Sequence, residues 1–403
     1  MKVAVAGTLL AAFGSHAPAT AARDCGGLPR LAVSTPAGFC VGVVADKMKY
    51  PRGVLPLSNG DLLVTEMGGW DAGLGAVWLF KRQNAAYRPS LPFKGLNRPH
   101  GVVMGPDGLV YVGTVGRIFR FDPGDPAGTA VDVIGGKAAT PALPSTGLHV
   151  LTSMLFDAQR NLLVGVGSAS DHCEGISGEP PRPDRPCAEA EGPDGRGVIR
   201  RYILQWPGGS VLSWDAHAHG LRNPLAMAIH PITGALWQAD NGRDALHAAI
   251  PTLKNDNALP RDELNLIAPG AHYGWPYCYD KGVASPEYPE AKCRTYRAPA
   301  RLLPAHSAPL GMMFYTGQVF PAEYRNSLLV GFHGYRQNGH RVVALLPDKH
   351  GAPLGRMIEL ISGWKTGPHS SGAPVDVRPG ADGAVYIADD RNGKVLRLQY
   401  DRQ

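Results

Sequence analysis

The chain has 403 residues, of which 44% are hydrophobic and 18% are charged, and its formal net charge is +6. This composition provides enough apolar residues for a core, and 51 glycines and 36 prolines indicate many turns between short strands. The lysines and arginines form no stripe interleaved with aromatic residues, which argues against nucleic acid as a partner.

The first residues have the layout of a secretory signal peptide. Lys2 precedes an apolar run at 3–13, and small residues at 19–21 form a cleavage site. We therefore predict a signal peptide over residues 1–22 and a single domain over residues 23–403. No later stretch approaches the roughly 20 apolar residues of a transmembrane helix. We expect an exported protein, periplasmic or secreted, with no transmembrane segment.

The six cysteines favour disulfides. Six cysteines allow 15 connectivities, but local loop closure in an oxidising compartment favours pairing between neighbours in the sequence. The expected pairs are Cys25 with Cys40, Cys173 with Cys187, and Cys278 with Cys293. A zinc site is the alternative, although the sequence has no C-x-x-C motif and no thiolate and histidine cluster at zinc spacing.

A repeated unit follows the signal peptide six times. Each copy has an apolar strand, a turn rich in Gly, Asp, Asn or Pro, a second alternating strand and then a third strand. The first three copies begin at Pro51 with PRGVLPLSNGDLLVTE, at Arg98 with RPHGVVMGPDGLVYVGTVGRIFRFD, and at His149 with HVLTSMLFDAQRNLLVGVGS followed by GVIRRYIL. The last three begin at Asn223 with NPLAMAIHPITGALWQAD followed by DELNLI, at Ala308 with APLGMMFYTG followed by NSLLVGFHG and HRVVALL, and at Ala373 with APVDVRPGADGAVYIADDRNGKVLRLQY.

One such unit cannot bury both faces of its small sheet, and radial stacking of several copies is the usual way to cover them. The repeats therefore predict an all-β fold, a six-bladed β-propeller with four-stranded antiparallel blades. A β-sandwich or two packed β domains are the alternatives, but neither explains a unit that recurs along almost the whole chain.

The first strand of each propeller blade lines the central channel, so the residues just before the repeats should face a common funnel. The expected lining is polar and largely cationic. It comprises Arg52, His100, His149, Arg222, Asn223, His333, Arg336 and the surroundings of Ala373.

Two of these positions predict chemistry. His149 sits on an otherwise apolar segment, where a lone histidine is more often a core residue, but its place at the start of an inner strand favours a general base. Arg222 and Asn223 suit a polyoxygenated anion or a carbonyl that gains negative charge. A capped turn before proline would explain Asn223 but not Arg222.

Oxygen ligands for calcium are concentrated near the end of the fourth repeat. The turn at 241–244 offers backbone carbonyls, and Asp262 and Glu263 follow it. Acidic turns are more often solvated surface, so this spacing alone is a weak signal. In the following GAHYGWP, glycine permits close packing of the backbone and the aromatic rings can cover a flat group.

Five segments together resemble the soluble quinoprotein sugar dehydrogenases, in particular their sorbosone dehydrogenase branch. They are LRNPLAMAIHP, NGRDAL, LPRDELNLIAPGAHYGWPYC, LLVGFHG and PVDVRPGADGAVYIADD, and the similarity spans residues 45–400. The resemblance implies an aldose or sorbosone-type dehydrogenase that acts on CH–OH groups. It also implies pyrroloquinoline quinone (PQQ) and calcium held over the funnel, a sugar substrate, and a respiratory quinone or cytochrome as electron acceptor.

The resemblance also assigns roles to residues. His149 matches the general base, while Arg222 and Asn223 match residues beside the reacting carbonyl of the cofactor. The backbone of Gly242 and Arg243 matches the turn that binds the calcium of the cofactor, and Glu263 with the carbonyl of Tyr273 matches a separate structural calcium site. We expect contacts to the cofactor from His100, Asn223, Arg243, His333 and Arg336.

Three places depart from the family pattern. One is the turn at 333–336, from His333 to Arg336, which replaces the lysine of the glucose-type enzymes. Leu148 stands where glucose-oxidising relatives carry an acid, so another residue must orient His149. Ala373 stands where many relatives have an arginine for the carboxylates of the cofactor. Two other functions stay open from the residues alone: a calcium-dependent lactone hydrolase and a non-catalytic propeller that binds a saccharide or a protein.

Overall fold

The computed structural model describes residues 24–84, 86–175, 178, 180–192, 194–364 and 372–401. The signal peptide expected over residues 1–22 lies outside these ranges. Across the described residues, no helix is long and apolar enough to span a membrane.

Six four-stranded antiparallel sheets form the blades, which confirms the predicted propeller. The first three blades consist of β4 (Pro51–Pro56), β5 (Leu62–Glu66), β6 (Gly75–Gln83) and β7 (Ala86–Leu96); β8 (Val102–Met104), β9 (Val110–Thr114), β10 (Arg117–Phe121) and β11 (Val131–Ile134); and β12 (Ser153–Phe156), β13 (Leu162–Val166), β14 (Val198–Gln205) and β15 (Ser210–Ala218).

The remaining blades complete the circle. They consist of β16 (Ala226–Ile229), β17 (Leu236–Asp240), β18 (Glu263–Leu266) and β21 (Arg301–Leu302); β22 (Pro309–Phe314), β23 (Leu328–Phe332), β24 (Arg341–Leu345) and β25 (Met357–Ile361); and β26 (Pro374–Pro379), β27 (Val385–Asp389), β28 (Lys394–Tyr400) and β3 (Phe39–Ala45).

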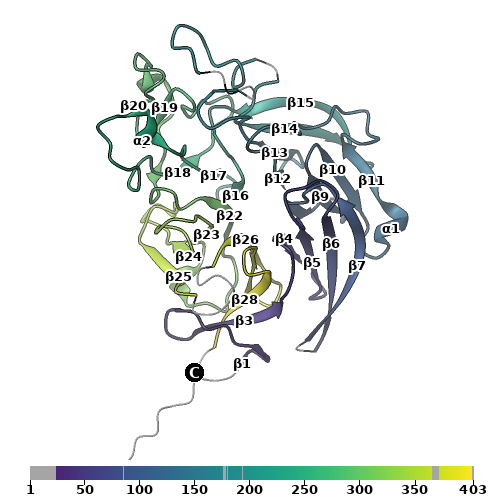
Figure 1. Cartoon of the computed structure of the whole chain (residues 1–403). Coiled ribbons are helices and arrows are strands. Elements are labelled where there is room, and N and C mark those ends of the chain that lie inside the picture. Colours follow the sequence, from purple (N-terminus) through teal and green to yellow (C-terminus); the bar gives the residue numbers. More distant parts are fainter. Residues whose placement is uncertain are drawn as a thin grey trace, which may run out of the picture.

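The ring is closed by two sets of contacts. Consecutive inner strands contact one another from β4 through β8, β12, β16, β22 and β26, and β26 contacts β4 again. At the seam, β3 from the beginning of the chain pairs with β28 from its end, and Figure 1 shows this purple strand beside the yellow one. Groups far apart in the sequence therefore meet around one channel.

Burial explains the apolar runs in the repeated units. The second strand of every blade is buried along its whole length, so it appears in the sequence as a short continuous apolar run. Apolar side chains of neighbouring blades then share a core, as where Leu63 and Val77 of the first blade pack with Val112 of the second. Close packing of the inner strands also requires glycine, because a Cβ on Gly53 would lie 2.3 Å from the carbonyl oxygen of His100.

Smaller elements lie outside the blades. They are β1 (Asp24–Cys25) paired with β2 (Leu28–Pro29), β19 (Cys278–Tyr279) paired with β20 (Val283–Ala284), α1 (Pro126–Thr129), α2 (Leu246–Ala249), and the 3-10 helices Cys293–Thr295 and Ala322–Tyr324. All three expected disulfides are present, Cys25–Cys40, Cys173–Cys187 and Cys278–Cys293.

Candidate active site at the channel mouth

The segments that lead into neighbouring blades meet at Ser168, just after β13. The N–H of His149 donates to the carbonyl of Ser168 at 3.2 Å, and the N–H of Ser168 donates to the carbonyl of Arg222 at 2.9 Å. His149 and Arg222 are therefore linked through a single residue, although 73 positions separate them in the sequence.

The side chains of His149 and Asn223 converge at Gly167. A Cβ on Gly167 would lie 2.4 Å from Cβ of His149 and 3.2 Å from Oδ1 of Asn223, so only glycine leaves room for both. His149 is half-buried, and its Nδ1 lies 2.8 Å from Oγ of Ser168. Burial, and next the charge of Arg222, lower the pKa of His149 well below its usual value, so the ring is neutral at neutral pH.

Asp240 shapes the turn that carries Arg222 and Asn223. Its carboxylate accepts hydrogen bonds from the backbone N–H of Arg222 at 2.7 Å and of Asn223 at 2.8 Å. Burial raises the pKa of Asp240 to about 6, and these two hydrogen bonds oppose the rise. Asp240 ends β17 in LWQAD, so an acid at the end of a second strand is a sequence signal that we missed.

The guanidinium of Arg222 is covered by the loop that follows β13. Asp171 accepts from Nε of Arg222 at 2.9 Å and from its NH2 group at 2.6 Å, and the NH2 group also lies 3.3 Å from Asp244. Only 3% of Arg222 is exposed. The structure thus places the predicted Arg222 beside His149, but its charge is matched by a carboxylate that the sequence did not point to.

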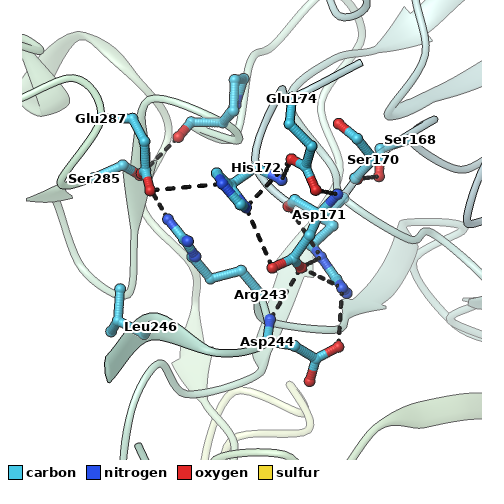
Figure 2. Close-up of polar contacts among 12 residues, drawn as sticks. Ser168, Ser170, Asp171, His172, Glu174, Arg243, Asp244, Leu246, Ser285 and Glu287 are labelled. Carbon is cyan, nitrogen blue, oxygen red and sulfur yellow. Dashed lines mark hydrogen bonds and ion pairs between the residues drawn. The ribbon is translucent and has the colours of Figure 1, made fainter. Parts of the chain in front are cut away.

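Figure 2 shows how this loop is held. His172 lies within 3.4 Å of both Asp171 and Glu174, and Glu287 accepts from Arg243 at 2.6 Å. Burial raises the pKa of Asp171, but the hydrogen bond from His172 and the charge of Arg222 outweigh it and leave that pKa below its usual range. Oppositely charged groups therefore fix the loop against the channel mouth.

A second polar cluster joins the first, second, fifth and sixth blades. Asp390 pairs with the NH1 group of Arg52 and lies 3.1 Å from Nε2 of His333. Nε of Arg52 donates to Nδ1 of His100 at 3.2 Å. All four side chains are buried. The structure thus brings together the predicted Arg52, His100 and His333 around Asp390, which the sequence analysis had not singled out.

The remaining predicted cations are engaged elsewhere. Arg336 donates to Asp256 at 2.6 Å, and the NH1 group of Arg243 is held by Glu287. Ala373 is fully buried, and its N–H donates to Asp389 at 3.0 Å. Cofactor contacts by Arg243 and Arg336 stay predictions.

The turn after β17 presents free backbone oxygens. Asp262 fixes it by accepting from the N–H of Gly242 at 2.8 Å, while the second carboxylate oxygen of Asp262 binds Ser307 and Ala308. Among the residues that the structure describes, none donates a hydrogen bond to the carbonyls of Gly242 or Arg243. Asp262 is thus a strut for the turn, and these two carbonyls are available to a cation.

A small cavity of about 30 Å³ lies beside this turn and is lined by Asp240, Asn241, Glu263 and Tyr273. Burial, and next the neighbouring carboxylate of Asp240, raise the pKa of Glu263 well above its usual value. The buried Oδ1 of Asn241 has no hydrogen-bond partner within the described ranges. The cavity lining also includes Arg222, Arg243 and Arg261, and Glu263 accepts a long hydrogen bond of 3.5 Å from Asn265. The unpaired Oδ1 of Asn241 and the carboxylate of Glu263 are oxygen ligands of the kind that calcium takes.

Comparisons with known proteins identify the family of the chain. A family model described as TrAA12-like matches residues 33–401. An aldose sugar dehydrogenase of Escherichia coli is 26% identical over 410 residues, which cover 91% of this chain and 94% of that protein. An uncharacterized protein of Borreliella burgdorferi is 33% identical over 193 residues, 46% of this chain and 48% of that protein, so the chain spans about half the length of that relative.

Two solved structures share the fold. The calcium structure of the Trichoderma reesei Carbohydrate-Active Enzymes Family AA12 superposes with a TM-score of 0.70 at 19% identity, covering 93% of this chain and 98% of that one. The holo form of the pyranose dehydrogenase PQQ domain from Coprinopsis cinerea gives a TM-score of 0.67 at 19% identity, covering 92% and 98%. At these identities the likeness establishes the fold alone.

Proposed function

The chain belongs to the TrAA12-like family, and we propose that it is an exported oxidoreductase that oxidises a sugar with PQQ and calcium. The names of its relatives support this proposal, since they include an aldose sugar dehydrogenase and a PQQ domain of a pyranose dehydrogenase. The sorbosone branch is a finer proposal, which rests on the sequence motifs.

The proposal rests above all on two free polar groups at the channel mouth. Nε2 of His149 and the side-chain amide of Asn223 make no hydrogen bond to any residue in the described part of the chain, and both side chains converge at Gly167. A neutral imidazole with a free ring nitrogen is suited to accept a proton from a substrate hydroxyl.

The residues present fit calcium at two places. The free carbonyls of Gly242 and Arg243 offer oxygen ligands at the mouth, and Glu263 and Tyr273 line the neighbouring cavity. Calcium prefers such a mixture of carboxylate and carbonyl oxygens and tolerates irregular geometry. We propose the first pair as ligands of the calcium that accompanies the cofactor, and the second as a structural site.

The protein's own groups would divide the work as follows. His149 takes the hydroxyl proton on Nε2, so the sugar O–H bond breaks and an N–H bond forms. Asn223 would present its amide beside that point. We propose that Arg222, whose guanidinium is paired with Asp171 in this structure, would stabilise negative charge that develops nearby. PQQ, when bound, would supply the two-electron oxidant for the hydride that leaves the carbon bearing this hydroxyl.

Dye reduction tests the proposal. We expect protein incubated with PQQ and Ca²⁺ to reduce an artificial acceptor dye with at least one aldose of a broad panel, and His149→Ala to lower turnover by about 10²-fold or more. No dye reduction with any sugar, together with no PQQ-dependent thermal shift, would sink the proposal. Hydrolysis of lactones without PQQ would support the lactone hydrolase instead.

A further inference from the structure

The hydrogen bonds of Ser168 determine which nitrogen of His149 carries the proton. Oγ of Ser168 lies 2.8 Å from Nδ1 of His149 and 2.6 Å from the carbonyl oxygen of Ser170. A serine hydroxyl has one proton, and a carbonyl oxygen can only accept. The hydroxyl proton therefore goes to Ser170, and Oγ of Ser168 must accept the N–H of Nδ1.

Ser168 has no freedom to reverse this pattern. Its side chain is fully buried, and its backbone is bonded to His149 on one side and Arg222 on the other. Ser170 is fixed in turn by Glu189, which accepts from the Ser170 N–H at 3.2 Å and from its hydroxyl at 2.7 Å. Hydrogen bonds donated in one direction thus connect the imidazole through Ser168 and Ser170 to Glu189.

We propose that Ser168 is the positioning residue that selects the Nδ1–H tautomer of His149, which leaves the lone pair of Nε2 free to receive the substrate proton. This inference rests on the proposed function for its catalytic consequence, but the tautomer itself does not depend on it. It also answers what orients His149 in a chain that has Leu148 in place of an acid.

A hydroxyl differs from a carboxylate in this position. Both accept the Nδ1–H bond, but a neutral hydroxyl adds no negative charge to stabilise an imidazolium. The negative charge that raises the pKa of His149 is that of Asp171, which is held by Arg222. The hydroxyl of Ser168 therefore fixes the direction of the ring without adding charge. The backbone of Ser168 does raise the pKa of His149, but burial and the charge of Arg222 outweigh that effect.

Long-range ¹H–¹⁵N correlation spectra of histidine-labelled protein test the tautomer directly, without cofactor or substrate. We expect the His149 signals, assigned by their loss in His149→Gln, to show Nδ1 protonated and Nε2 unprotonated. A wild-type spectrum with Nε2 protonated would overturn the inference, and this result needs no Ser168 variant to fold.

Variants then test the role of the hydroxyl. Ser168→Ala should give a mixture of tautomers and lower kcat/KM by about tenfold or more, while Ser168→Thr, which keeps the hydroxyl, should restore the single tautomer. Ser213→Ala, on an exposed position of β15, is the matched control and should change neither readout. An unchanged tautomer in Ser168→Ala would overturn the role of Ser168. If the spectra show the expected tautomers but the protein oxidises no sugar, the result would count against the proposed function and not against the role of Ser168.

Discussion

Val41 lies opposite Leu398 in the register that joins the beginning of the chain to its end. Both side chains are buried in the same core, so the seam of the ring is held by apolar packing as well as by the backbone pairing of β3 with β28. The Cys25–Cys40 bridge ties the preceding segment to this strand. Closure of the propeller therefore depends on residues that lie outside the six repeats.

Removing that bridge should destabilise the whole ring. For Cys25→Ser/Cys40→Ser we expect the free energy of unfolding to fall by about 3 kcal/mol, because a bridge that closes a loop of this size restricts the unfolded chain by that amount. Guanidinium unfolding followed by tryptophan fluorescence measures the loss.

The Cys173–Cys187 bridge offers a matched control, because its sequence separation is 14 against 15. It lies in the connection between β13 and β14, where the unbridged segment also gains freedom in the folded state. The Cys173→Ser/Cys187→Ser variant should therefore lose less stability. Equal losses in the two variants would contradict a special role of the seam.

Asp240 should be required for the turn that carries Arg222 and Asn223. Asp240→Ala leaves two buried N–H groups without an acceptor, so we expect a loss of about 2 kcal/mol or more. Asp240→Asn keeps one acceptor oxygen and should lose less. Asp215→Asn, at a partly exposed surface pair with Arg201, is the control and should stay within about 0.5 kcal/mol of the wild type. An Asp240→Ala variant with the same free energy of unfolding as the wild type would refute this role.

The repeats and the disulfides could be predicted because their signals are local. Turn residues and apolar runs recur along the chain, and each bridge joins neighbouring cysteines. The pairing of β3 with β28 could not be predicted, because Phe39–Ala45 is a single strand without a repeat of its own. Nothing in an isolated strand specifies a partner more than 350 residues away.

In the candidate site, too, some residues could be predicted from local sequence signals and others could not. His149, Arg222 and Asn223 were found because they precede predicted inner strands. Ser168 and Asp171 were not predicted. Their roles come from contacts between loops of different blades, and the spacing of residues in the sequence does not indicate such contacts. Asp240 could have been found, because an acid also ends the second strand of the last blade in VYIAD.

Calcium should stabilise the protein through Glu263. The cation would compensate a partly buried carboxylate beside Asp240, so we expect Ca²⁺ to raise the Tm of the apoprotein and EGTA to reverse the rise. Glu263→Gln should remove most of this calcium-dependent shift, whereas Glu290→Gln, at an exposed position, should retain it. An equal shift in wild type and Glu263→Gln, measured by differential scanning fluorimetry, would rule out Glu263 as a ligand.

The pH dependence of turnover should report on His149. Burial and the charge of Arg222 lower its pKa, and a general base works only when neutral. Activity should therefore be constant above the pKa of the folded protein and fall as the pH drops through it, with the inflection below the ordinary value of about 6.5. His350→Gln, at an exposed position, should leave the profile unchanged.

Asp171 sets the position of that inflection. Its carboxylate lies against Arg222 and raises the pKa of His149, in opposition to the larger effects of burial and the arginine. Asp171→Asn removes the negative charge and leaves the guanidinium less compensated, so protonation of His149 becomes harder. The acid limb of kcat/KM should move to lower pH in this variant. A shift to higher pH would mean that Asp171 does not act on His149 through its charge, and that another group controls the base.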